Sequence, residues 1–190
     1  MWLAERGTPA RRDPRRARPI GFAAVIAVAL VVSGCQFRPL YGERTDASGA
    51  VRPGAATELA AISIDGADSR VEQVLRNELI FLFTGGGTPA PSRYRLRILT
   101  DQDQEALAVQ REDEIPAAVT VTLRANFILE EIGSGRTLLT GTSFQTATYS
   151  FSTQRVANLR ALRDAEDRAA RAVAENITLR IAAYFDARAR

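Results

Sequence analysis

The sequence predicts an α+β fold, a two-layer sandwich in which a four-stranded, mostly antiparallel or mixed sheet carries two helices on one face. Two segments, 93–99 and 119–129, alternate between apolar and polar residues with the period of a half-exposed strand. The segment 71–83 has apolar residues at helical spacing, and 153–187 has the length and apolar stripe of a long helix. The predicted element order is β-α-β-β-β-α.

Residues 1–34 have the organisation of an export signal. Six arginines precede an apolar run of 13 residues, from Ile20 to Val32. A helix of that length rises about 20 Å, which is well short of the roughly 30 Å hydrocarbon core of a bilayer. A basic segment followed by a short apolar segment therefore predicts a cleaved signal peptide and not a membrane span.

The only cysteine, Cys35, follows this apolar run directly after the small residues Ser33 and Gly34. The arrangement resembles the lipobox of bacterial lipoproteins, in which the cysteine sulfur is diacylated, the signal is cut before the cysteine and the new N-terminus is acylated. The alternative is a cysteine buried in a core, which its position at the edge of the apolar run disfavours. We expect S-diacylglycerol and N-palmitoyl groups on Cys35, since two or more acyl chains anchor a protein stably.

Residues 35–57 are predicted to be a lipidated tether, extended and not helical, because turn-forming glycine and proline recur in it. Residues 58–190 are long enough for one domain with one core. Leu59–Ile64 is the first predicted strand. Ser69 and Glu72 then form a capping box, and the helix after it ends at the triple glycine 85–87.

Three strands are predicted next. The first covers 93–99, with Tyr94, Leu96 and Ile98 facing inward, and either continues or resumes at 106–110 after a polar break. The second covers 119–129, a hairpin turn occupies 132–136, and the third covers 137–151. Its many threonines suit a sheet with one solvated face.

The last helix is predicted to begin with Ser152 or Thr153 as its cap. Asp164 and Asp167 each precede an arginine by four residues, in the favourable order for helix ion pairs. Its apolar stripe consists of Val156, Leu159, Ala169, Val173, Ile177, Ile181 and Tyr184.

Composition excludes several function classes. The 25 basic residues outnumber the 22 acidic ones, but the excess lies in residues 1–34, and the remainder has a net charge of −1. No argument for nucleic-acid binding therefore remains. The chain has no histidine, and lipidation would occupy its only thiol. We therefore expect neither an enzyme nor a metal or cofactor site. Every basic residue is arginine, which favours phosphate recognition or reflects codon bias.

The segment Cys35-Gln36-Phe37-Arg38-Pro39-Leu40-Tyr41-Gly42 resembles the start of mature LptE, the lipopolysaccharide-assembly lipoprotein family of the Gram-negative outer membrane. The order of elements over 58–190 also resembles that family. The strand from Val119, the turn with Gly135 and the strand from Thr137 are similar to its core.

The resemblance implies a lipoprotein of the cell outer membrane, anchored to the inner leaflet on the periplasmic side. It implies that the chain plugs the lumen of an LptD-type β-barrel, helps that barrel assemble and assists the insertion of lipopolysaccharide into the outer leaflet. No catalysed chemistry is implied. The alternative is an auxiliary lipoprotein of an envelope lipid-transport ABC system.

Arg93, Arg95 and Arg97 are predicted to share one strand face at intervals of about 7 Å, and Arg124 can extend this row from a neighbouring strand. Guanidinium groups at such spacing can bind the phosphates of lipid A, so the four arginines are the candidate lipopolysaccharide-binding residues. The alternative is a solvated or barrel-facing edge whose arginines pair with acids on the partner.

Overall fold

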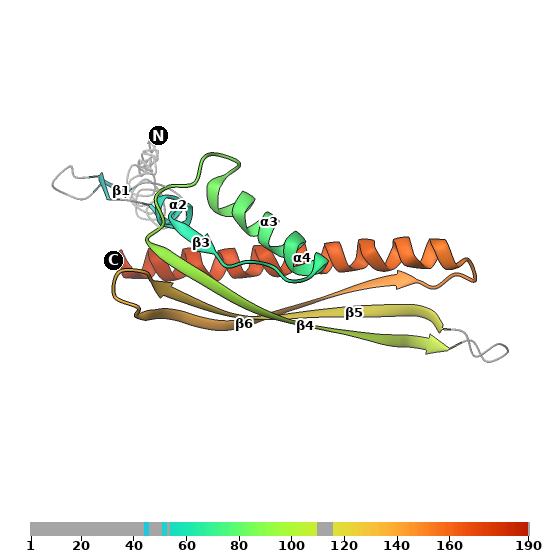
Figure 1. Cartoon of the computed structure of the whole chain (residues 1–190). Helices are drawn as coiled ribbons and strands as arrows, with labels where there is room; N and C mark the ends of the chain where they lie inside the picture. The colour runs from blue at the N-terminus through green and yellow to red at the C-terminus, as the bar shows by residue number, and fades with distance from the viewer. Residues whose placement is uncertain (1–43, 46–50, 53, 110–115, 190) are drawn as a thin grey trace, which may run out of the picture. The chain divides into compact units, whose positions relative to one another are not determined.

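The computed structural model describes residues 44–45, 51–52, 54–109 and 116–189. Within them, a long four-stranded sheet is covered on one face by helices (Figure 1). The strand order is β3-β4-β5-β6. β3 pairs with β4 in parallel, and the other two pairings are antiparallel. The predicted α+β sandwich with a mixed sheet and helices on one face is confirmed.

Three strands form a long meander. They are β4 (Tyr94–Val109), β5 (Pro116–Glu131) and β6 (Thr137–Ser150). β4 crosses the predicted polar break without interruption. The hairpin between β5 and β6 lies at the predicted position, and Gly135 takes a φ of 66°, a left-handed conformation that favours glycine.

The start of the domain differs from the prediction. Leu59 lies in a short helix, α2 (Ala55–Ala60), and only Ile62–Ile64 form the strand β3. The helix buries Ala55 and Leu59 on one side, because residues four apart share a helix face. Ala55–Thr57, predicted to be extended tether, are therefore helical. Two further short strands, β1 (Arg44–Thr45) and β2 (Val51–Arg52), pair in antiparallel fashion.

Helix α3 (Arg70–Thr84) begins with the predicted capping box. The Glu72 amide donates to the Ser69 hydroxyl, and the Glu72 carboxylate accepts from the Ser69 amide. The same carboxylate accepts from Thr100 of β4 at 2.7 Å. This hydrogen bond, followed by that from the Asp68 amide, lowers the pKa of Glu72. The start of α3 is thereby attached to the sheet.

Helix α4 (Arg155–Arg188) runs along the sheet and packs on α3, β5 and β6. The predicted cap is wrong. Gln154 occupies the N-cap position without a side-chain bond, and Asn158 accepts from the Ser152 amide at 2.7 Å instead. Val156 and Leu159 are also exposed, by 62% and 51%, because their turns lie at the helix end and outside the buried core. No helix in the described part of the chain is long and apolar enough to cross a membrane.

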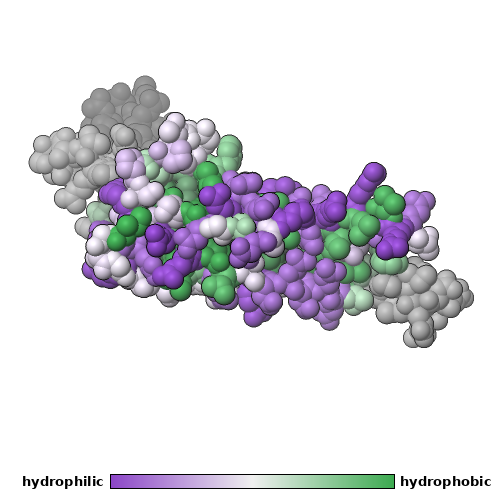
Figure 2. Space-filling view, viewed as in Figure 1, coloured by the Kyte–Doolittle hydropathy of each residue, from purple (hydrophilic) through white to green (hydrophobic). Residues whose placement is uncertain are grey.

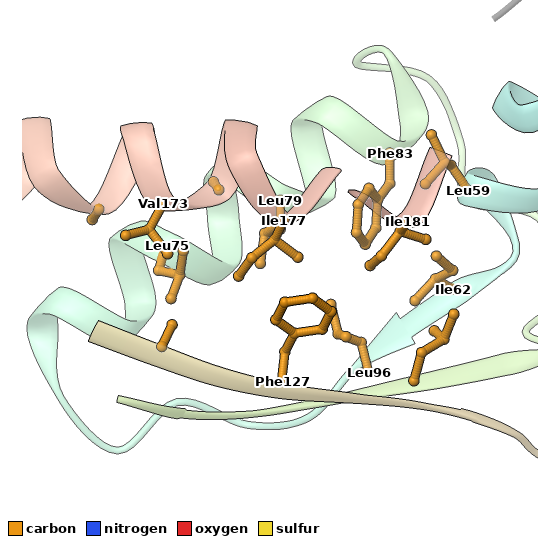
Figure 3. Close-up of a cluster of buried hydrophobic side chains, with 14 of the residues drawn as sticks. Leu59, Ile62, Leu75, Leu79, Phe83, Leu96, Phe127, Val173, Ile177 and Ile181 are labelled. Carbon is orange, nitrogen blue, oxygen red and sulfur yellow. The ribbon is translucent and has the colours of Figure 1, made fainter. Parts of the chain in front are cut away.

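The core lies between the covered face of the sheet and the two long helices (Figure 3). Phe127 of β5 is at its centre and is 1% exposed. Its cross-strand partner is Gly141, where a Cβ atom would lie 2.7 Å from the Phe127 Cζ atom and 2.9 Å from Cε1. The absence of a side chain at Gly141 therefore makes room for the phenylalanine ring.

Gly141→Ala is expected to lower the free energy of unfolding by about 1–3 kcal/mol, the usual cost of overpacking a core. Urea denaturation of the full chain measures it. The matched control is Gly133→Ala, where nothing lies within 4 Å of the added Cβ atom, and it should change stability by less than about 0.5 kcal/mol. Equal stability of both variants and the native chain would contradict the role of Gly141.

Candidate functional site on the open face of the sheet

The open face is the side of the sheet that α3 and α4 do not cover. Alternation along the strands brings one residue in two to this face. From β5 and β6 it receives mainly short polar side chains: Thr120, Thr122, Asn126, Thr140, Thr142, Thr146 and Thr148. Cross-strand hydrogen bonds join Thr142 to Asn126 at 2.7 Å and Thr120 to Thr148 at 3.2 Å. The face is therefore polar and largely uncharged in this region.

Arg95 and Arg97 lie on β4 in phase with the open face, whereas Arg93 lies one residue before the strand, and each of the three is about half exposed. Each also has an acidic partner within this chain. Arg93 pairs with Glu58 of α2 at 2.8 Å, and Arg97 pairs with Glu130 of β5 at 2.5 Å. Arg95 lies 3.7 Å from Asp65. A phosphate would have to compete with three internal carboxylates.

The geometry of the first and third pairs is reinforced by neighbours. Glu58 also accepts from the Tyr94 hydroxyl at 2.7 Å, and the Arg93 guanidinium lies 5.4 Å from the Tyr94 ring centroid. Burial, followed by the hydrogen bond to Glu58, raises the pKa of Tyr94. The hydrogen bond that Arg97 donates to Glu130 raises the pKa of Arg97, which stays charged. Arg93 therefore connects the start of β4 to α2, and Arg97 connects β4 to β5.

Arg124 is the exception among the four predicted residues. Its cross-strand neighbours are Asp101 on β4 and Phe144 on β6. In the described part of the chain Arg124 forms no ion pair within 4 Å, even with Asp101. The structure therefore separates Arg124, whose charge is available, from the three arginines with internal partners.

Two apolar residues that the sequence reasoning did not select flank Arg124. Phe144 lies directly across from Arg124 on β6 and is 62% exposed. Leu99 lies on β4 two residues before Asp101, diagonally across from Arg124, and is 70% exposed. The period-two alternation already places Leu99 in phase with the outward arginines and Phe144 in phase with the outward threonines, so this signal was present. An unpaired guanidinium between two exposed apolar side chains can bind both the anionic and the apolar part of an amphiphile. It therefore suits such a ligand better than the three arginines that already have acidic partners.

No group of three metal-ligating side chains occurs among the described residues. Cys35, the predicted lipid-attachment site, lies outside them. In Figure 2 hydrophilic side chains cover much of the visible surface, with hydrophobic patches among them. The described surface therefore suits contact with a polar environment or a mixed polar and apolar ligand.

Known structures share this fold. A lipoprotein from Caulobacter crescentus CB15 is 21% identical, with a TM-score of 0.59 over 70% of this chain and 96% of that one. Rare lipoprotein B from Shewanella oneidensis is 11% identical, with a TM-score of 0.53 over 68% and 98%. Lipoprotein B from Nitrosomonas europaea is 12% identical, with a TM-score of 0.50 over 66% and 83%. No curated protein matches the chain.

The sequence model of the LptE family, described as lipopolysaccharide-assembly, matches residues 58–181. The match begins within α2 and ends within α4, so it includes the four-stranded sheet, all of α3 and most of α4. It confirms the resemblance predicted from the sequence, and it supports a lipoprotein of lipopolysaccharide assembly over the alternative of a transport-system accessory. The chain belongs to the LptE lipopolysaccharide-assembly family.

Proposed function

We propose that this chain is an outer-membrane lipoprotein that plugs an LptD-type β-barrel, helps the barrel assemble and assists lipopolysaccharide insertion into the outer leaflet. Acyl chains on Cys35 hold it in the inner leaflet of that membrane, on the periplasmic side. The chain binds the barrel and lipopolysaccharide and catalyses no reaction, so it needs no cofactor. Family membership supports the role in lipopolysaccharide assembly.

The observation that carries the plug role is the long, polar, open face of the sheet. The lumen of a transmembrane barrel is polar, so a plug needs a polar surface. The threonine-rich face supplies one without a layer of helices over it.

The dimensions agree. The 16 residues of β4 and of β5 correspond to about 50 Å, and the 34 residues of α4 also correspond to about 50 Å. The apolar band of an outer-membrane barrel is only about 25 Å tall. The domain is therefore long enough to extend through such a lumen.

Photo-crosslinking tests the plug. A benzophenone amino acid replaces Thr122 on the open face in one variant and Glu175 on the outer side of α4 in another, since both residues are accessible. A plug is enclosed on all sides, so both variants should form adducts with a large β-barrel protein in intact cells. Adducts from one face only would indicate a peripheral partner, and adducts with an ATPase complex would favour the transport-system alternative.

The anchor has its own measurement. Intact-mass analysis of the mature protein should find acyl chains on Cys35, and Cys35→Ser should lack them. A native protein without added mass would remove the lipoprotein part of the proposal while leaving the barrel part open.

Within this function, Arg124 is the best candidate for contact with lipid A. Among the described residues no carboxylate pairs with it, and Leu99 and Phe144 offer apolar surface beside it. Arg124 can thus bind a phosphate while Leu99 and Phe144 contact an acyl chain of the same molecule. The row Arg93, Arg95 and Arg97 remains the second candidate, and there each guanidinium must exchange one carboxylate for another anion.

Arg124→Ser should weaken the binding of labelled lipopolysaccharide to the full chain roughly tenfold, since a hydrogen bond to a charged group contributes about 1.5–3 kcal/mol. Fluorescence anisotropy at fixed ionic strength measures it. Arg97→Ser is the matched control on the same face, and the triple replacement of Arg93, Arg95 and Arg97 by Ser tests the row. A larger loss in the triple variant would assign binding to the row, and unchanged affinity in all variants would refute both sites.

A further inference from the structure

The two edges of the sheet differ in how far their backbone groups are covered by other parts of the chain. β4 is 16 residues long, but β3 pairs only with Tyr94–Leu96 at its beginning. The loop after β3 lies beside Ile98 and Thr100. Beyond that, from Asp101 to Leu107, no strand pairs with the outer side of β4 among the residues that the structure describes.

The hydrogen bonds show which backbone groups point outward. The Asp65 amide donates to the Leu96 carbonyl at 3.1 Å, on the β3 side, and the Ile132 amide donates to the Arg93 carbonyl at 3.0 Å, on the β5 side. Alternate residues of a strand face opposite neighbours. The N–H and C=O groups of Gln102, Gln104 and Ala106 therefore point away from β5 at this edge, each residue offering one donor and one acceptor.

At the opposite edge, on β6, side chains of α4 bind some of the outward backbone groups. Two arginines of α4 reach over it, because Arg180 donates to the Thr142 carbonyl at 2.8 Å and Arg168 donates to the Thr148 carbonyl at 3.0 Å. These guanidinium groups occupy acceptors that an added strand would use. In the described part of the chain, no side chain caps the backbone groups of Gln102, Gln104 or Ala106 in this way.

The side chains of the same stretch indicate the partner. Asp101, Asp103 and Glu105 alternate along it on the open face, all three are exposed, and none forms an ion pair among the described residues. Pairing with a second copy would bring the same acidic side chains opposite one another, which is destabilising. Opposite charges directly across a strand pair are favourable.

An open groove accompanies the edge on the other face. Its volume is about 500 Å³, and its lining includes Arg70 and Glu72 of α3, Thr100–Gln102 of β4 and Glu166 of α4. Arg70 pairs with Glu166 and with Asp167. Side chains of an added strand that point towards the helices therefore have space beside this edge.

We propose that the edge of β4 from Asp101 to Leu107 binds an extended segment of another polypeptide by strand addition. Main-chain bonds to Gln102, Gln104 and Ala106 hold the segment, and basic side chains at alternate positions meet Asp101, Asp103 and Glu105. The site goes beyond the proposed function, because neither the plug nor the lipid A contact requires it.

The test uses the full chain and a fluorescent nine-residue peptide in which arginine and valine alternate, with binding followed by anisotropy. Gln104→Pro removes one outward N–H without breaking the ladder to β5, since edge positions tolerate proline. It should weaken binding at least tenfold. The matched control, Thr146→Pro, removes an outward N–H from the β6 edge and should leave binding unchanged. Loss in the control alone would place the site on β6 and overturn the proposal.

A second peptide separates strand addition from simple charge attraction. It has the same sequence, with alternate backbone amides N-methylated, and it should fail to bind. Equal binding of both peptides would overturn the proposal.

Amide hydrogen exchange in the native chain provides a readout that does not depend on a variant folding. The unmodified peptide should slow exchange at Gln102, Gln104 and Ala106. Unchanged exchange there with the peptide bound would overturn the proposal.

Discussion

The fold depends on the close seating of α4 on the covered face of the sheet. Half of the ten buried residues of α4 are alanines, which form a surface of small side chains: Ala165, Ala169, Ala170, Ala174 and Ala182. Such a surface contributes little volume to the core, and the distance between packed elements depends on the side chains at the contact. Many of the large core residues come from the facing elements, with Phe127, Leu123 and Leu129 from β5 and Leu75, Leu79 and Phe83 from α3, while α4 itself adds Ile177, Ile181 and Phe185. Small and large side chains complement each other across one interface, and Gly141 extends the same complementarity into the sheet.

Because the core lies on one face of the sheet, the other face is polar and the two edges of the sheet can differ from each other. The open face is polar and long, and two exposed apolar side chains, Leu99 and Phe144, lie near Arg124. On the β6 edge two arginines of α4 occupy backbone carbonyls, those of Thr142 and Thr148, whereas no side chain does so at the distal β4 edge in the described part of the chain. The same helix that completes the core thus also controls which sheet edge is available, and the acidic row on β4 limits what can approach it.

The sequence pattern correctly predicted those features that depend on interactions between residues close together in the chain. Alternation identified the faces of β4 and β5, the capping box identified the start of α3, and the triple glycine its end. Prediction failed where long-range contacts decided the outcome. Asp167 pairs with Arg70 of α3, 97 residues away, and not with the arginine four residues later. β4 continues through 100–105 because pairing with β5, and not an apolar face, sustains it.

The candidate site was predictable in part for the same reason. The orientation of Arg93, Arg95 and Arg97 followed from strand period alone, but their acidic partners come from α2, the loop after β3 and β5. Those partners depend on strand order and register, which a single sequence does not specify. Leu99 and Phe144 were in phase with the open face, yet their proximity to Arg124 depends on the register of two strand pairs.

The position of α4 at the end of the chain imposes an order on folding. A polypeptide that emerges N-terminus first delivers α3 and the three long strands before the helix that covers them. Until residues as far as Phe185 have arrived, the apolar face built around Phe127 has no lid, and the arginines that close the β6 edge are absent. The nascent domain is then a sheet with a sticky face and two open edges. During this interval the exposed apolar face and the unpaired strand edges favour aggregation of the nascent domain.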